Sequence, residues 1–228
     1  MNNTEHDYTD YDIDDSDVRD GDNFASLRKA AAQGDIDAQY ELGNCYYNGN
    51  GVSEDKAEAV KWYRQAAEQG NVDAQYKLGN CYYNGNGVSE DKAEAVKWYR
   101  QAAEQGYATG QCFLGVCYDR GEGVKKDYTE AAKWYHKAAA QGDARGQFLL
   151  GRCYYSGAGV NKCYKKAIKW YRKAAEQGNV KAQYKLGWCY CYGEGVYKDK
   201  AEAVKWWRKA AEQGDSMAKW HLKSLHES

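Results

Sequence analysis

Apolar side chains recur at helical spacing in residues 56–70, which read KAEAVKWYRQAAEQG. The apolar positions fall at i, i+3, i+4, i+7 and i+8, at Ala59, Trp62, Tyr63, Ala66 and Ala67. This spacing places them on one face of a helix and the charged residues between them on the other. Gly70 follows as the expected left-handed residue beyond the last turn. The segment is therefore predicted to be an amphipathic helix that ends at a glycine.

The same segment returns along the chain at a fixed interval. It recurs unchanged at 92–106 and in edited form at 128–142, 164–178 and 200–214, so each copy begins 36 residues after the one before. A fixed period of about 20–50 residues is typical of a solenoid, in which each repeat packs only on its neighbours. The sequence therefore predicts one elongated array of repeats.

A second apolar pattern precedes each copy and predicts another helix, which spans residues 73–84 in the second repeat. Its repeated apolar face consists of Ala74, Leu78, Cys81 and Tyr82. Gly79 lies beside this face and is expected to let the paired helix approach closely. The linker 84–90 supplies Gly85 and Gly87, which suit positive φ, and a Val that is expected to enter the core. Each repeat is thus predicted to be a helical hairpin.

The period also sets the predicted organisation of the chain. Residues 1–22 are expected to be an acidic, disordered tail, because they carry nine acids and few aliphatic side chains. The repeat array is expected to cover 23–228. Its parts are a cap helix at 23–34, repeats at 35–70, 71–106, 107–142, 143–178 and 179–214, and a C-terminal cap helix at 215–228.

Composition narrows the classes of protein that fit. The mean hydropathy of -0.94 leaves no stretch near the roughly 20 apolar residues that a membrane span needs. The N-terminus lacks a basic patch followed by an apolar segment, so no signal peptide is predicted. A cytoplasmic protein is expected. The alternative left open is a secreted or host-directed interaction factor that is exported by a leaderless route. The net charge of -1 divides into -8 for residues 1–22, which hold nine acids and one Arg, and hence +7 for the rest.

Five of the eight cysteines occupy one repeat position: Cys45, Cys81, Cys117, Cys153 and Cys189. Equivalent helices of neighbouring repeats are expected to lie about 8–10 Å apart or more. A disulfide needs Cα atoms within about 7 Å. The five are therefore predicted to be free, buried thiols, which favours a reducing compartment.

The order AQYxLGxxYYxGxGVxxDxxxAxxWYxxAAEQG, which residues 74–106 carry, resembles the Sel1-like repeat, a relative of the tetratricopeptide repeat. The resemblance covers about 23–228. Departures include Cys163 for the linker Asp, Cys112 for a Tyr, and Trp207 for the Tyr after Trp206. The resemblance implies an all-α fold, a right-handed α/α superhelix whose first helices line a concave surface. It also implies an adaptor or scaffold that binds other proteins and is not an enzyme.

Comparison of the repeats with one another points to candidate binding residues. On the first helix, the positions of Asp73, Lys77, Asn80 and Asn84 differ between repeats and share a single face. We interpret this face as a concave groove that binds a peptide or protein. Its candidate residues are Asp37, Glu41, Asn44, Lys77, Asn80, Phe113, Val116, Arg120, Arg145, Leu149, Arg152, Lys181, Lys185, Trp188 and Tyr192.

The charge along this face changes from acidic in the first repeat to basic and aromatic in the last ones. We therefore expect a partner segment with an acidic part, bound near 145–185. Phe113, Leu149 and Trp188 are expected to be exposed and to form an apolar contact patch. Two alternatives remain open: a solvated face that is free to vary, and the acidic tail acting as a pseudo-ligand in the basic half of the groove.

Other classes of function find less support. The Ser-x-x-Lys sequences lack the accompanying elements of a β-lactamase site, and the Gly-x-Gly of each linker lacks a preceding strand. The Cys and His residues lack zinc spacing, so no metal, cofactor or catalytic residue is predicted. Glu94 and Glu104 interleave with Lys97 and Arg100 on the outer face, which argues against nucleic-acid binding. The partner and the oligomeric state are not specified by the sequence.

Overall fold

The computed structural model describes the backbone of residues 15–226 and the side chains of residues 23–224. Within that range the chain forms twelve α-helices and no strand. The first helices of the hairpins are α2 (Ile36–Asn48), α4 (Val72–Asn84), α6 (Ala108–Arg120), α8 (Ala144–Ser156), α10 (Val180–Tyr192) and α12 (Ser216–His226). The second helices are α1 (Asp15–Ala32), α3 (Lys56–Glu68), α5 (Lys92–Glu104), α7 (Tyr128–Ala140), α9 (Tyr164–Glu176) and α11 (Lys200–Glu212).

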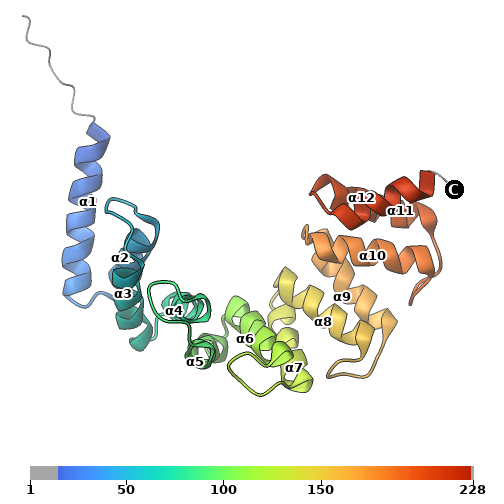
Figure 1. Cartoon of the computed structure of the whole chain (residues 1–228), viewed down its shortest axis with the longest axis horizontal. Helices are drawn as coiled ribbons and strands as arrows, with labels where there is room; N and C mark the ends of the chain where they lie inside the picture. Colours follow the sequence, from blue (N-terminus) through green and yellow to red (C-terminus); the bar gives the residue numbers. More distant parts are fainter. Residues whose placement is uncertain (1–14, 227–228) are drawn as a thin grey trace, which may run out of the picture.

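The hairpins stack in chain order into an open arc (Figure 1). In that view α4 and α6 lie toward the inside of the curve, and α5 and α7 lie toward the outside. Each helix packs on its neighbours in the chain, and α1 and α12 lie at opposite ends. The predicted all-α solenoid of 36-residue hairpins is confirmed.

The N-terminal boundary differs from the prediction. Helix α1 begins at Asp15, so residues 15–22, which were expected to be disordered, are helical. Residues 1–14 lie outside the described part of the chain, and so does the hypothesis that the tail acts as a pseudo-ligand.

Most of the repeat helices begin at a residue whose side chain caps the first turn, and the first helices of the five repeats end at a left-handed glycine. Asp91 precedes α5, and its side chain accepts a hydrogen bond from the backbone N–H of Glu94 at 2.9 Å. Gly85 ends α4 in the left-handed region with φ of 71°, and Gly87 has φ of 72°. A side chain on Gly87 would also collide with the backbone of α3, since its Cβ would lie 2.0 Å from the Lys56 carbonyl oxygen. Both linker glycines thus serve the roles predicted for them.

The buried core residues recur at the same positions of each repeat. Leu78 and Tyr99 are fully buried, as are their equivalents at 42, 114, 150 and 186 and at 63, 135 and 171. A Cβ on Gly79 would lie 2.7 Å from the Tyr99 ring, so glycine is needed for α4 to approach α5 this closely. The predicted close approach of the paired helices is confirmed.

Buried glutamines connect the hairpins. Gln75 of α4 donates from Nε2 to the Ala67 carbonyl of α3 at 3.1 Å, and its Oε1 accepts from Gln105 of α5 at 2.8 Å. The same pair of bonds recurs at Gln39, Gln111, Gln147 and Gln183. These five side chains are at most 5% exposed. Each therefore joins three consecutive helices through one amide, and we call the set the glutamine ladder.

The periodic cysteines form a second ladder. All eight cysteines lie within the described residues and are free thiols, which confirms the prediction for the five periodic ones. Four of the five periodic ones are buried, and Cys45 in the first repeat is half-buried. Burial raises the pKa of Cys81 to about 11 and that of Cys117 to about 12, so both stay protonated at neutral pH. These thiols are small core residues and poor nucleophiles.

Replacement of a ladder amide tests the strength of the contacts between hairpins. Gln111→Leu leaves the Ala103 carbonyl and the Gln141 amide without their buried partner. We expect it to lower the free energy of unfolding by about 1–3 kcal/mol. Urea denaturation followed by circular dichroism measures this loss, with Gln101→Leu on the exposed side of α5 as the matched control. Equal midpoints for the two variants would show that the ladder does not stabilise the array.

Helix α9 lacks the cap that the other repeat second helices share. Cys163 occupies the N-cap position and makes no side-chain cap hydrogen bond. Cys163→Asp should raise the free energy of unfolding by about 0.5–2 kcal/mol, because it supplies an acceptor for the first turn. The reciprocal change Asp91→Cys should lower it by a similar amount. An unchanged thermal midpoint for Cys163→Asp would contradict this account of the cap.

Candidate functional site

The candidate residues lie on α2, α4, α6, α8 and α10. We call the surface formed by their varying positions the first-helix face. At its N-terminal end Asp37 and Glu41 are exposed. Asn44 and Asn80 turn inward, since their Oδ1 atoms accept hydrogen bonds from the hydroxyls of Tyr63 and Tyr99 at 2.8 Å. These two asparagines thus support the hairpin, and the binding role predicted for them stays a prediction.

A cleft of about 380 Å³ opens on this face between α6, α8 and the start of α10. Six of the predicted residues line it: Val116, Arg120, Arg145, Leu149, Arg152 and Lys181. Tyr135, Phe148, Asp119, Asn179 and Val180 complete the wall. The structure thus brings four basic and two apolar candidates of the third to fifth repeats into one cleft.

The apolar candidates are less exposed than the sequence suggested. Leu149 and Val116 are only 7% and 6% exposed, because both pack into the core around α6, α7 and α8. Phe113 is half-buried against Tyr76 and Tyr99. The prediction that Leu149 is exposed was wrong, and Leu149 and Val116 form the floor of the cleft.

The aromatic candidates of the fifth repeat lie beyond this cleft. Trp188 is half-buried and packs on Tyr192, with 4.4 Å between ring centroids, while Tyr192 is 50% exposed. Lys185 is half-buried, and its Nζ lies 5.7 Å from the ring centroids of Tyr155 and Tyr184. This group extends the first-helix face toward the C-terminal end of the array.

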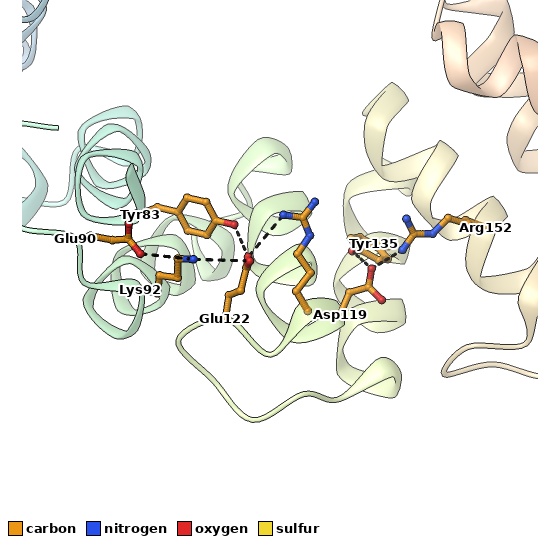
Figure 2. A network of polar contacts seen from close by, with 8 residues as sticks. Tyr83, Glu90, Lys92, Asp119, Glu122, Tyr135 and Arg152 are labelled. Carbon is orange, nitrogen blue, oxygen red and sulfur yellow. Dashed lines mark hydrogen bonds and ion pairs between the residues drawn. The ribbon is translucent and has the colours of Figure 1, made fainter. Parts of the chain in front are cut away.

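Two acidic residues that sequence reasoning missed lie beside the cleft (Figure 2). Asp119 pairs with Arg152 and accepts a hydrogen bond from the Tyr135 hydroxyl at 3.5 Å. Asp119 occupies a position held by Tyr in the first, second and fourth repeats, and this substitution was the signal available in the sequence. Arg152 is therefore already neutralised within the protein.

Glu122 forms a second group of polar contacts. It accepts a hydrogen bond from the Tyr83 hydroxyl, and its carboxylate lies 3.8 Å from both Lys92 and Arg120 (Figure 2). Because Tyr83 and Lys92 belong to the preceding hairpin, the network joins neighbouring repeats along the rim of the cleft. Arg120 is partly neutralised by this contact.

Four cations of the candidate set have no carboxylate partner among the described residues: Lys77, Arg145, Lys181 and Lys185. The Arg145 guanidinium lies 4.3 Å from the Phe113 ring centroid, which holds it at the cleft by a cation–π contact. Lys181 of α10 is exposed and lines the same cleft. The cleft therefore presents positive charge that an anionic group can neutralise.

No group of three or more metal-ligating side chains occurs among the residues that the structure describes. Over the same part of the chain, no helix is long and apolar enough to cross a membrane.

Tandem hairpins that preserve their core and vary one exposed face define an α-solenoid repeat protein. A model of the Sel1 repeat matches residues 36–71, 72–107, 108–143, 144–179 and 180–215, and the chain belongs to the Sel1 repeat family. These matches begin one residue after the predicted repeats. Sel1 repeat proteins generally mediate protein–protein interaction and are generally not enzymes.

Solved structures share this architecture. A protective antigen of uropathogenic Escherichia coli strains is 41% identical with a TM-score of 0.86, covering 91% of this chain and 44% of its own. The chain thus spans less than half the length of that antigen. A Sel1 repeat protein from Oxalobacter formigenes is 36% identical with a TM-score of 0.85, covering 93% of this chain and 87% of its own.

An immunity protein from Pseudomonas aeruginosa, 24% identical with a TM-score of 0.52 over 80% of this chain and 67% of its own, shares the fold alone. The comparison with curated proteins gave no match.

Proposed function

We propose that the protein is a non-enzymatic interaction scaffold that binds an acidic segment of a partner protein in the cleft between α6, α8 and α10. The observation that carries this proposal is the pair of cations without carboxylate partners, Arg145 of α8 and Lys181 of α10, which line one cleft. A carboxylate between them neutralises both charges. Arg145 is also held in place by Phe113, which lowers the entropy lost on binding.

The floor of the cleft suits a protein segment. Val116 and Leu149 expose only their edges, so they offer a shallow apolar surface beside the charges. An extended peptide can place an acidic side chain between the cations and lay its backbone along this floor. The acidic residues Asp37 and Glu41 at the other end of the first-helix face favour one orientation of such a segment, since they repel its acidic end.

An enzymatic role finds no comparable arrangement. The thiol pKa values of Cys112, Cys117 and Cys153 are raised by burial, to about 12, 12 and 11. A nucleophilic cysteine needs a lowered pKa and a neighbouring base. Binding without turnover is therefore the function that this site supports best.

Charge reversal at Arg145 and Lys181 tests the proposal. Arg145→Glu with Lys181→Glu should weaken binding of a fluorescent, Asp/Glu-rich peptide roughly tenfold, because each exposed ion pair contributes about 0.7 kcal/mol. Fluorescence anisotropy measures the affinity. The matched control is Lys61→Glu with Lys97→Glu, which reverses two charges on the second helices α3 and α5. Equal loss in both double variants would indicate general electrostatic attraction and no groove site.

Asp119 should act as an internal competitor for the partner's carboxylate. Asp119→Asn releases Arg152 yet keeps an acceptor for the Tyr135 hydroxyl. We expect the affinity for the acidic peptide to rise about two- to fivefold, the range of one exposed ion pair. Adding Arg152→Gln to Asp119→Asn should cancel the gain. If Asp119→Asn leaves the affinity unchanged, Arg152 does not contact the ligand.

A further inference from the structure

Helix α9 lacks an ion pair that the equivalent second helices share. In α3, α5, α7 and α11 a Glu of the first turn pairs with a Lys three residues later, as Glu94 does with Lys97 at 2.7 Å. In α9 the Glu is replaced by Lys166, and its first turn contains no acid. Lys169 consequently has no carboxylate partner among the described residues.

The departure concentrates positive charge. The sequence of α9, YKKAIKWYRKAAE, holds five cations and one acid, whereas that of α3, KAEAVKWYRQAAE, holds three cations and two acids. Lys165, Lys169 and Lys173 follow one another at four-residue spacing, where like charges repel. Lys165 and Lys166 also face the positive end of the helix dipole.

These features destabilise α9, and they coincide with its missing Asp cap at Cys163. None of them follows from the packing of the hairpin, since the buried residues Ala167, Ile168 and Tyr171 match those of the other second helices. Sequence features that destabilise a helix are expected where its surface serves a function.

An apolar cleft of about 400 Å³ lies beside α9. Its walls include Ala132 and His136 of α7 and Leu150 and Tyr154 of α8. Both α7 residues are smaller than their equivalents. Ala132 stands where the other second helices have Val60, Val96, Ile168 and Val204, and His136 stands where they have Arg64, Arg100, Arg172 and Arg208.

The substitution at His136 changes the wall of the cleft. At the junctions on either side, the Arg donates to a Tyr of the next hairpin, as Arg100 does to the Tyr118 hydroxyl at 2.6 Å, and covers its ring. The imidazole of His136 makes no such bond to Tyr154 and instead lies edge-on to Trp170 of α9, with 6.1 Å between ring centroids. At this junction the ring of Tyr154 therefore lacks the guanidinium that lies over the equivalent tyrosines.

The cleft and the basic helix form one surface. The Nζ atom of Lys166 lies 5.3 Å from the ring centroid of Tyr154, which lines the cleft. His136 reaches α9 through Trp170. Positive charge thus borders an apolar recess on the side of the hairpins that the second helices form.

We propose that this surface is a second binding site, which takes an acidic protein segment with one large apolar side chain. The cations of α9 would neutralise the acids, and the cleft beside Ala132 and Tyr154 would hold the apolar side chain. Charge complementarity alone would also suit a nucleic acid. The apolar recess favours a peptide, because a side chain anchor buries its surface there while phosphates gain nothing from it.

The probe is a fluorescent peptide of six Asp/Glu residues around a central Leu-Tyr pair. Its affinity is measured by anisotropy in the Arg145→Glu/Lys181→Glu background, so that the groove does not contribute. We expect Lys166→Glu to weaken binding about tenfold while it raises the urea midpoint, because it restores the ion pair with Lys169. Loss of binding together with gain of stability cannot come from misfolding.

Ala132→Val tests the recess separately. It restores the larger side chain of the other repeats and should weaken the Leu-Tyr peptide several-fold, yet leave a peptide with Gly-Gly at the centre unchanged. Lys205→Glu on α11 is the charge control and should leave the affinity unchanged. The Lys166→Glu variant with Arg145 and Lys181 intact is titrated as well, and its affinity reports on the cleft between α6, α8 and α10 alone.

Two results would overturn the proposal. The first is undiminished binding of the Leu-Tyr peptide to both Lys166→Glu and Ala132→Val. The second is tighter binding of a single-stranded oligonucleotide of equal charge, with a steep dependence on salt, which would assign the surface to nucleic acid.

Discussion

The glutamine ladder is the interaction on which the rest of the molecule depends. Each buried amide satisfies a carbonyl of the preceding helix and an amide of the following one, so its geometry admits a single offset between hairpins. A buried amide without these partners is costly, and this cost excludes other registers. Because the ladder and the Gly79–Tyr99 contact fix the stacking, the exposed positions are free to change from repeat to repeat.

Much of this scaffold follows from the sequence, because the contacts that form it are local or recur at the period. The helices and the left-handed Gly85 were predictable from residues a few positions apart. The close approach at Gly79 was predictable because this glycine recurs in each repeat beside the apolar face. The site was predictable only in part. How far each variable position is buried depends on how neighbouring hairpins tilt, which the sequence does not specify. Leu149 was therefore expected to be exposed, whereas it is buried in the floor of the cleft. The Asp119–Arg152 pair joins residues 33 positions apart and has no counterpart at the other repeats.

The same logic connects the two proposed sites. One lies on the first helices, where Arg145 and Lys181 lack partners, and the other on the second helices, where Lys166 replaces a Glu. In both, cations without a carboxylate partner among the described residues lie beside an apolar surface. Sel1 repeat proteins bind other proteins, and a scaffold with two such faces can hold two acidic segments at once. The fixed stacking would then set the distance between them.

Hydrogen–deuterium exchange with and without a saturating acidic peptide tests the central claim most directly, because it locates binding along the array. In the Lys166→Glu variant, slowed exchange should be confined to α6, α8 and the first turn of α10, which surround the cleft. The stacked hairpins at α2 to α4 should exchange as they do without the peptide. Protection spread evenly over all repeats, or absent from α8, would contradict a cleft built from three particular first helices.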